Sequence, residues 1–418
     1  MKKSHVIALT QMWESFSFFG MRALLVLYLV TGAGYNAKDA VILYTLYIAS
    51  VKIFAGAGGY IVDRFLGYKQ AVIIGGTLIV TGHLFLTFSS FFFVSLGCIV
   101  AGSAIFRVSL QTLLGLIGDS KGFTIFYVGM NFGGLLAAVL CGFVAQIYGW
   151  HAGFGLAALG MIIGMGFFLS KLKLFDDLEK SKTTSPFITL PMGYVAALGI
   201  ALLLTYFNVV HAWALPLGLI AFVAILSKVG RKFSIVMPLL LLIAFSTAEE
   251  LWGSLLMLFS ETHIDRLFFG FEIPSAAIAA TNPLTIIFLG PLLAKREMRY
   301  ELKLAIAFLA LAFAFFILYV ASIMPNPSVI YFIVGLAAIA IGELFLVPTI
   351  LEAMSKMAPG SGLMMGATII ALSMGTLLSG EVARIPYGSG VTFLLIGSAA
   401  SIIFVGLLTK LRFRGRTV

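Results

Sequence analysis

The chain has 418 residues, of which 61% are hydrophobic and 11% charged, and its mean hydropathy is +1.09. This composition lies far outside that of soluble globular domains, so water cannot be the main solvent of the folded protein. The formal net charge of +10 would suggest nucleic-acid binding in a soluble protein, but here the basic residues must first be placed relative to a membrane. Cys98 and Cys141 lie in apolar stretches and indicate neither a disulfide framework nor a metal site.

Apolar segments long enough to cross a bilayer recur along the whole chain. A bilayer core of about 30 Å needs roughly 20 helical residues. The first segment follows Lys2 and Lys3 directly, without a small-residue cleavage site, so we expect an uncleaved span. The sequence predicts an all-α polytopic membrane protein with fourteen spans, at residues 7–30, 40–62, 71–88, 92–115, 123–147, 154–169, 191–207, 212–226, 235–259, 276–293, 304–323, 329–357, 364–378 and 391–408.

One long polar linker divides these spans. It occupies residues 171–187, after the sixth span. We therefore predict an N-terminal six-helix bundle (1–170), the linker, an inserted helix pair (188–232) and a C-terminal six-helix bundle (233–418). A cytoplasmic N-terminus places most of the 27 Lys and Arg in cytoplasmic loops and tails. This predicts a multi-pass protein of a bacterial inner membrane with both termini in the cytoplasm.

Ionisable residues interrupt the predicted spans. Each costs about 2.5 to 3.5 kcal/mol at the centre of a lipid-facing helix, so we expect them to line a shared water-filled cavity. The three cations belong to the first bundle and three of the four acids to the second, which predicts a polarised cavity suited to a zwitterion. The alternative is that they form internal salt bridges that hold the bundles together. The residues concerned are Glu14, Arg22, Lys52, Arg107, Glu249, Glu250 and Glu343.

Spacing indicates which of these side chains share a face. Glu14, Phe18 and Arg22 are spaced i, i+4, i+8, so they rise along one side of the first helix, with acid and base about 12 Å apart. Glu249 and Glu250 point about 100° apart on a helix, so only one of them can face the cavity squarely.

The segment 59–69 resembles the loop between the second and third helices of major facilitator transporters. It carries Asp63 and Arg64 between Gly59 and Gly67. The resemblance implies a tight turn and a charge pair that help to control rocking of the first bundle. This motif indicates the superfamily and carries no information on substrate.

Further stretches resemble the proton-dependent oligopeptide transporter family. They are residues 13–28, 122–133, 148–154, 265–284 and 342–348, and the resemblance extends over nearly the whole chain. The resemblance implies that Glu14 and Arg22 belong to the first-helix coupling and binding motif. It also implies that Glu250 is the seventh-helix acid that titrates and closes a gate, and that Glu343 is the tenth-helix acid that receives a peptide amine. Asn131 and Asn282 match contacts to the peptide backbone.

The function expected from this resemblance is proton-coupled import of di- and tripeptides by alternating access, with a major facilitator fold of two six-helix bundles plus an inserted pair. Glu14 and Glu250 would exchange protons. We expect no cofactor other than protons, no metal, no nucleic-acid partner, and a monomer that binds a small-molecule substrate within the bilayer. No motif of an enzyme is found. The expected substrate-binding residues are Arg22, Lys52, Arg107, Asn131, Asn282 and Glu343.

The chain departs from the family's pattern at several positions in the first, second and fourth helices. Gln11 and Ser15 replace an acid and an arginine of the first-helix motif, and Arg107 stands for a lysine of the fourth helix. Arginine does not readily lose its proton, so coupling through that lysine cannot work in the same way. Lys52 stands where the family has a tyrosine. It either replaces the lost partner of Glu14 or adds a third anion-binding group.

These departures leave two other functions open. One is transport of a small organic anion, a modified peptide or a siderophore, with altered proton coupling. The other is a non-transporting membrane sensor that has kept the scaffold.

Overall fold

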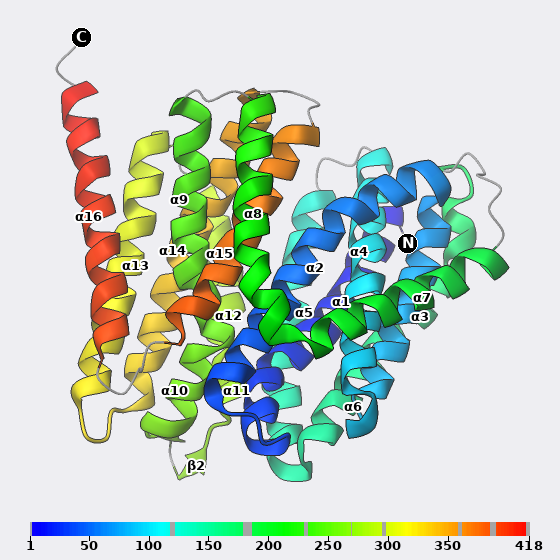
Figure 1. Ribbon diagram of the computed structural model, residues 1–418, viewed down its shortest axis with the longest axis horizontal. Coiled ribbons are helices and arrows are strands. Elements are labelled where there is room, and N and C mark those ends of the chain that lie inside the picture. The colour runs from blue at the N-terminus through cyan, green and yellow to red at the C-terminus, as the bar shows by residue number, and fades with distance from the viewer. Residues whose placement is uncertain are drawn as a thin grey trace. The chain divides into compact units, whose positions relative to one another are not determined.

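The computed structural model describes residues 2–117, 122–178, 186–229, 233–268, 270–294, 298–357, 362–384 and 390–414. The chain forms two compact units, Met1–Val210 and His211–Val418 (Figure 1). The boundary between the units falls within the predicted helix pair 188–232. The four-part division of the chain stays a prediction, and residues 179–185 of the predicted linker lie outside the described residues.

The first unit consists of helices and short connecting turns. Asn36 caps the second long helix by accepting a hydrogen bond from the Asp39 backbone N–H at 2.9 Å. The elements are α1 (Lys3–Leu27), the π-helical turn η1 (Tyr28–Gly32), α2 (Ala37–Phe65), α3 (Tyr68–Phe85), η2 (Ser89–Phe91), α4 (Phe92–Ile117), α5 (Gly122–Tyr148), α6 (Trp150–Ser170), η3 (Leu172–Phe175) and α7 (Pro186–Thr205).

The second unit is also helical, apart from one small antiparallel hairpin. Helix α8 begins just before the unit boundary. The elements are α8 (Phe207–Val229), α9 (Phe233–Glu249), the 3₁₀ turn η4 (Glu250–Gly253), α10 (Leu255–His263), β1 (Leu267–Phe268), β2 (Phe271–Glu272), α11 (Ser275–Ile278), α12 (Thr281–Ala294), α13 (Tyr300–Ile323), α14 (Val329–Met357), α15 (Gly362–Val382) and α16 (Val391–Arg414).

All fourteen predicted spans coincide with helical segments, which confirms the predicted fold class. In the described part of the chain, ten helices are long and apolar enough to cross a membrane, and three shorter apolar helices accompany them. Two expectations of continuous spans are wrong in detail. The segment 235–259 is broken by η4, and the segment 276–293 is broken between α11 and α12. The second break immediately precedes Asn282 and Pro283, and proline is tolerated in the first turn of a helix.

Close packing of α1 against α5 organises the first unit. Helix α1 also contacts α6, while α4 packs against α2, α3 and α7. At the α1–α5 contact, a Cβ added to Gly133 would overlap the carbonyl oxygen of Met12 and lie 3.0 Å from the backbone nitrogen of Phe16. Glycine is therefore required here so that two backbones can approach closely, as is typical of helix pairs in membranes.

Substituting Gly133 by alanine should destabilise the protein by about 1 to 3 kcal/mol, because the added methyl group meets backbone atoms that cannot swing away. Gly166 on α6 is the matched control, since a Cβ built there meets nothing within 4 Å. Gly166→Ala should be neutral or slightly stabilising. Denaturant unfolding of both variants in detergent tests this, and equal effects would contradict the packing argument.

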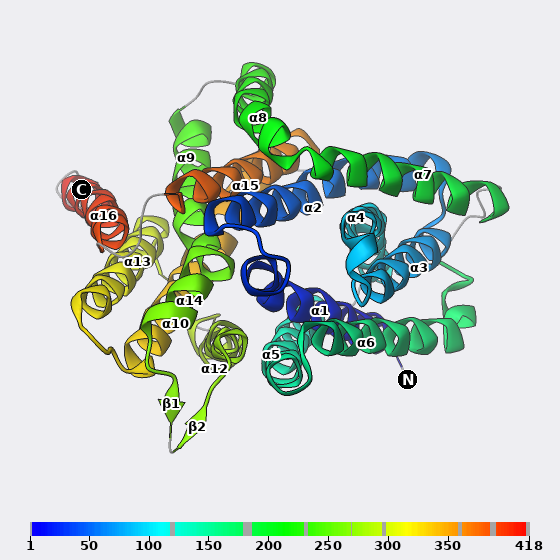
Figure 2. The same cartoon turned by 60° about the horizontal axis from the view of Figure 1, so that its bottom comes forward.

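Helix pairs build the second unit. Helix α13 packs against α14 and α16, α9 packs against α15, and α12 packs against α14; α13 and α16 lie side by side in Figure 2. The ring of Phe393 meets that of Phe259 edge-on, with centroids 5.0 Å apart, and lies 6.2 Å from Phe315. Helix α8 contacts α15 through buried His211, whose Nδ1 lies 3.3 Å from a carboxylate oxygen of Glu381.

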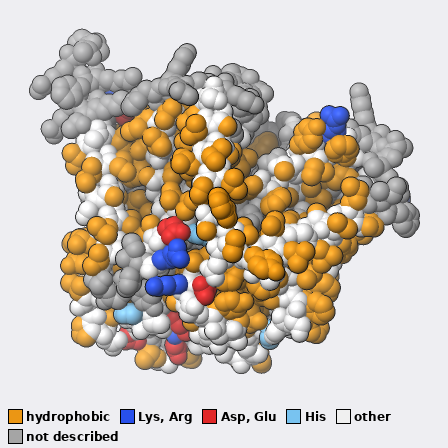
Figure 3. All heavy atoms as spheres, in the orientation of Figure 1, with side chains coloured by type: hydrophobic (Ala, Val, Ile, Leu, Met, Phe, Trp, Pro, Cys, Tyr) orange, Lys and Arg blue, Asp and Glu red, His pale blue; other side chains and the backbone are white. Residues whose placement is uncertain are grey.

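The surface carries many exposed apolar side chains, which suits lipid as the surrounding solvent. Hydrophobic atoms cover much of the face seen in Figure 3. Helices α7 and α8 are prominent in this respect, with exposed residues that include Leu198, Leu202, Val209, Trp213 and Leu217. In a soluble protein a surface of this kind would mark an interaction site or an aggregation risk. Together with the ten long apolar helices it identifies a multi-pass membrane protein.

Arg266 braces the β1–β2 hairpin. Its guanidinium donates to Glu272 at 2.7 Å, to Glu261 at 3.2 Å and to the carbonyl of Ile273 at 3.1 Å. The Arg266 side chain is 12% exposed, whereas its carboxylate partners Glu261 and Glu272 are 34% and 52% exposed. Gly270 supplies the positive φ of +80° at the tip of the hairpin.

Replacing Arg266 by alanine should cost about 1 to 3 kcal/mol, because two carboxylates and a carbonyl lose a charged donor at once. Arg384, which is 47% exposed and pairs with Glu381 three residues away, is the control. Arg384→Ala should change the stability by less than about 0.5 kcal/mol. The unfolding midpoints of the two variants test this prediction. A larger loss of stability in Arg384→Ala than in Arg266→Ala would contradict it.

Candidate functional site

A buried ion pair joins α1 to α4 in the first unit. Arg107 donates from Nε and Nη2 to the same oxygen of Glu14, Oε1, each at 2.8 Å. The other oxygen, Oε2, accepts the side-chain amide of Gln11 at 2.7 Å, and the same amide nitrogen lies 3.0 Å from Ser15 Oγ. Glu14 is 1% exposed. Both of its oxygens are therefore engaged by donors from the protein.

The guanidinium of Arg107 is held on a second side by an aromatic ring. Its Cζ lies 4.1 Å from the ring centroid of Phe18, one turn after Glu14 on α1. A cation over an aromatic face at this distance is attracted electrostatically. The Arg107 side chain is still 27% exposed, so part of the guanidinium remains accessible. The ion pair fixes the direction of the group without burying it completely.

Arg22 lies about two turns after Glu14 on α1 and is 7% exposed. Its Nε donates to the hydroxyl of Tyr44 on α2 at 2.7 Å. Glu14, Phe18 and Arg22 are all buried, in agreement with the prediction that they share one inward face of the first helix. Tyr47, one turn after Tyr44, is fully buried, and its charge environment includes Arg107, Glu14 and Arg22.

The remaining predicted residues of the first unit are placed as follows. Lys52 is half-buried on α2, and the ion-pair partner of Glu14 among the described residues is Arg107 rather than Lys52. Asn131 on α5 is 8% exposed and donates to the carbonyl of Tyr127, one turn earlier, at 3.0 Å. Arg64 stacks over the Tyr60 ring in the last turn of α2. The backbone of Asp63 lies in the same turn, but its side chain is outside the described part of the structure.

Two acids lie where the second unit changes helix. Glu249 ends α9 and is half-buried, whereas Glu250 begins the 3₁₀ turn η4 and is 2% exposed. Of these neighbours, Glu250 is thus the more deeply buried. A 3₁₀ stretch within a long helix often marks a functional hinge. The break places Glu250 at the point where α9 and α10 can change direction.

A third acid of the second unit is held by an amide. Asn282, at the start of α12, donates from Nδ2 to Oε2 of Glu343 on α14 at 3.1 Å. Glu343 is half-buried, and Gly342 beside it allows α14 to approach Phe245 of α9 and the carbonyl of Ala307 on α13. Two residues that the family resemblance predicts as substrate contacts, 61 positions apart in the chain, are therefore direct neighbours.

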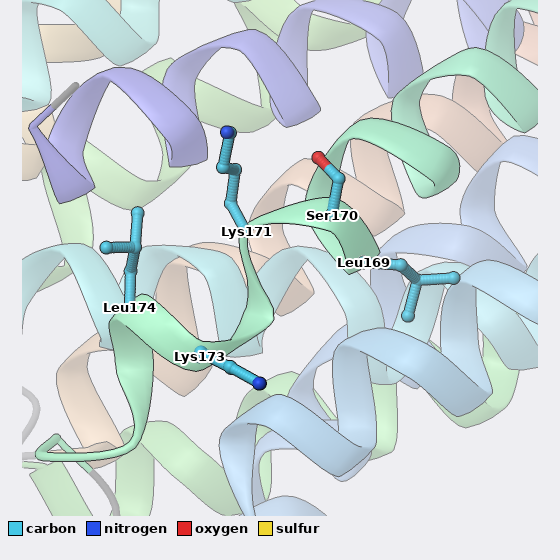
Figure 4. Close-up of a pocket in the computed structure, with 5 residues that line it drawn as sticks. All are labelled: Leu169, Ser170, Lys171, Lys173 and Leu174. Carbon is cyan, nitrogen blue, oxygen red and sulfur yellow. The ribbon is translucent and has the colours of Figure 1, made fainter.

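A surface pocket of about 370 Å³ lies away from these charged groups. It is formed at the end of α6 by Leu169, Ser170, Lys171, Lys173 and Leu174 (Figure 4). The two lysine side chains leave opposite sides of the turn in this view, so they do not converge on one ligand. None of its residues belongs to the predicted site. We do not assign this pocket a role in substrate binding.

The same linker is tied to the start of the first unit. Lys3 donates to Asp177 at 2.6 Å, and Lys69, at the start of α3, donates to Asp176 at 2.7 Å. The hydrogen bond from Lys3 lowers the pKa of Asp177 below its ordinary value. The N-terminus of α1 and the chain after α6 therefore meet at one end of the first unit.

Sequence reasoning missed the partners that organise these charges. Gln11 was noticed as a replacement, but its hydrogen bond to Glu14 was not predicted, and Tyr44 and Tyr47 were not singled out. The spacing of the two tyrosines, three residues apart on an apolar helix, would have placed both hydroxyls on one face. The choice between Lys52 and Arg107 as partner of Glu14 needed the structure.

Comparison with known proteins agrees with this architecture. A family model described as Major Facilitator Superfamily matches residues 7–380. The chain is 30% identical to the peptide transporter YePEPT of Yersinia enterocolitica over 90% of its own length and 86% of that protein. It is 28% identical to a di-/tripeptide transporter of Lactococcus lactis over 84% and 82% of the two chains.

Solved structures show the same fold over nearly the whole chain. A crystal structure of a peptide transporter POT in complex with sulfate covers 99% of this chain and 95% of that one, with a TM-score of 0.85 at 26% identity. A structure of such a transporter in complex with alafosfalin gives a TM-score of 0.86 at 27% identity, with the same coverage of both chains. On these grounds the chain belongs to the proton-dependent oligopeptide transporter family of the major facilitator superfamily.

Proposed function

We propose that the protein is a proton-coupled symporter that imports di- and tripeptides or closely related compounds by alternating access. The relatives named as peptide transporters support this substrate class. The observation in this chain that carries the proposal is the Asn282–Glu343 contact. It presents a half-buried carboxylate next to an amide, a combination that can bind the charged amine of a peptide and a neighbouring peptide carbonyl or N–H.

The charges of the first unit complement this acid. Arg22 and Arg107 are each oriented by a hydrogen bond or ion pair, and Lys52 adds a third cation. Oriented guanidinium groups are well suited to a carboxylate. We assign the peptide carboxylate to these cations and the peptide amine to Glu343, with Asn131 as a further contact to the peptide backbone.

Glu250 is our candidate for the group that carries the coupling proton. It is an acid buried at a break between helices, and a buried carboxylate without bulk water favours the neutral form more readily than an exposed one. Glu14 also remains a predicted proton carrier. Asp63 and Arg64 are proposed to act in gating, through the end of α2.

Transport of a small organic anion is the second candidate. Three cations against one acid in the spans of the first unit favour it, because a purely anionic substrate would use all three. Thermal stabilisation of the purified protein by a panel of peptides and organic anions separates the two, since a ligand that binds the folded state raises the melting temperature. Stabilisation by dialanine that requires Glu343 supports the peptide. If organic anions alone stabilised the protein, and Lys52→Ala abolished this stabilisation, peptide transport would be refuted.

Location and assembly follow from the same proposal. We place both termini in the cytoplasm of a bacterial cell, with the protein in the inner membrane, because the basic linker and the N-terminal lysines meet at one end of the first unit. We propose a monomer, although one protein of similar fold, 24% identical, is described as tetrameric. Light scattering of the detergent-solubilised protein measures the assembly state.

A further inference from the structure

The carboxylate of Glu14 is surrounded by groups that favour one protonation state. Arg107 contributes two N–H donors to Oε1, and the Gln11 amide contributes one to Oε2. All three donors require lone pairs on the carboxylate. The carboxylate thus accepts three hydrogen bonds, two of them from a guanidinium that carries a full positive charge.

Arg107 cannot relieve this constraint by losing its own proton. Arginine stays charged under all conditions that a cell provides, in contrast to lysine. If Glu14 took up a proton, the guanidinium would keep its charge beside a neutral acid in a mostly buried position. Phe18 on the other side supplies only the face of a ring as compensation. Protonating Glu14 would therefore remove the principal counter-charge of Arg107.

The orientation of Gln11 depends on the same charge. Its Nε2 donates to Glu14 and to Ser15, while its Oε1 is buried without a partner among the described residues. Turning the amide over would bring Oε1 to the Ser15 hydroxyl, which can donate, and to Glu14, which can donate only when it carries a proton. Gln11 thus adds a donor to the ionised carboxylate, whereas an acid at this position would compete with Glu14 for a proton.

Other charged groups near Glu14 act in the same direction. Helices α5 and α6 pack against α1. Among the described residues of these two helices, one side chain can be charged at neutral or acidic pH, namely His151, which lies at the opposite end of the helix bundle from Glu14. Helix α4 carries Arg107 alone. On α2 the ionisable groups closest in sequence to the cluster are Lys52 and the tyrosines Tyr44 and Tyr47. No second acid contacts Glu14 among the described residues, so like-charge repulsion does not favour its neutral form, although its burial does.

From these contacts we infer that Glu14 is a positioning residue: together with Gln11 it orients Arg107 toward the substrate carboxylate and does not carry the coupling proton. This inference rests on the proposed proton-coupled transport and changes the role given to Glu14 within it. The coupling proton then travels on acids of the second unit. Gln11, an apparent loss from the family motif, becomes the residue that stabilises the ionised state.

Infrared difference spectroscopy of the purified protein tests the protonation state directly. Spectra recorded between acidic and neutral pH should show the same protonated-carboxyl signal in wild type and in Glu14→Gln. The positive control is Gln11→Glu, which replaces an amide by a carboxyl of the same shape 2.7 Å from a carboxylate oxygen. This variant should add a protonated-carboxyl signal. The double variant, which also carries Glu14→Gln, should show a changed signal. A wild-type signal that disappears in Glu14→Gln would overturn the inference.

Transport by proteoliposomes gives an independent readout. Glu14→Gln should raise the KM for dialanine about tenfold, because Arg107 loses a charged hydrogen-bond partner, and should leave the pH profile of uptake unchanged. Loss of pH-driven accumulation with intact peptide exchange would instead identify Glu14 as a proton carrier and overturn the inference. If wild type moved no peptide at all, the proposed function would fail, while the infrared comparison would still decide the role of Glu14. Gln11→Ala serves as the milder variant if Glu14→Gln does not fold.

Discussion

Replacing Arg107 by alanine is expected to lower the free energy of unfolding by about 3 to 5 kcal/mol, the range measured when one partner of a buried pair is removed. Glu14 is 1% exposed, so without Arg107 its charge would remain buried with only the Gln11 amide as donor. Denaturant unfolding of the purified protein in detergent measures the loss. Arg107→Lys should lose less, because lysine keeps the charge but neither the two-nitrogen contact nor the stacking on Phe18.

Lys3→Ala is the matched control for this prediction. Lys3 also joins two distant segments of the first unit through an ion pair, with Asp177, but the two side chains are 28% and 66% exposed. Solvent-exposed pairs contribute about 0 to 1 kcal/mol. If Lys3→Ala and Arg107→Ala destabilised the protein equally, burial of Glu14 would not be the reason for the effect.

Glu343→Gln is expected to reduce peptide transport most strongly among the single substitutions in the second unit. Removing one partner of a desolvated charge pair costs about 2 to 5 kcal/mol, which is roughly 30-fold or more in apparent affinity. The glutamine keeps the shape and can still contact Asn282, so the fold should persist. Uptake of labelled dialanine into proteoliposomes at several substrate concentrations measures the change.

Two controls make this prediction specific to the peptide amine. Glu352 is an exposed acid on the same helix, and Glu352→Gln should leave KM within about twofold of wild type, as is usual for surface substitutions. An N-acetylated dipeptide should bind poorly to wild type and no worse to Glu343→Gln. A large additional loss for the acetylated peptide would mean that Glu343 does not bind the amine.

The spans of the fold could be predicted from the sequence because the bilayer imposes a length and an apolar composition that can be counted. The interruptions at 250–253 and 279–280 were not predicted. Both lie within segments that length and hydropathy predict as single spans, and tertiary packing decides which backbone hydrogen bonds are given up. Glu250 and Asn282 were selected as functional residues, but the breaks beside them became visible only in the structure.

The candidate site could be predicted in its members but not in its pairings. The cost of charge in a membrane identifies Glu14, Arg107 and Glu343 from a single sequence. The partner of each charged residue depends on contacts between helices that are far apart in the sequence. Glu14 and Arg107, for example, are separated by 93 positions. A hydrogen bond three residues apart, from Gln11 to Glu14, was within reach of helical spacing. It was overlooked because Gln11 was interpreted only as the loss of an acid.

The two units would contribute differently to proton coupling. The first unit orients Arg22 and Arg107 through the hydrogen bonds they donate to Tyr44 and Glu14, so by our inference it offers an anion site. The second unit places Glu250 at a helix break and Glu343 in contact with the Asn282 amide. A protein arranged in this way would bind the substrate carboxylate with one unit and respond to pH with the other.

Uptake of dialanine by proteoliposomes under an imposed proton gradient tests the central claim most directly. Proton-coupled peptide transport predicts accumulation above the external concentration when the outside is acidic, and loss of this accumulation when an uncoupler is added or when Glu250 is replaced by glutamine. Equilibration without accumulation, or uptake that ignores the gradient and the uncoupler, would contradict it.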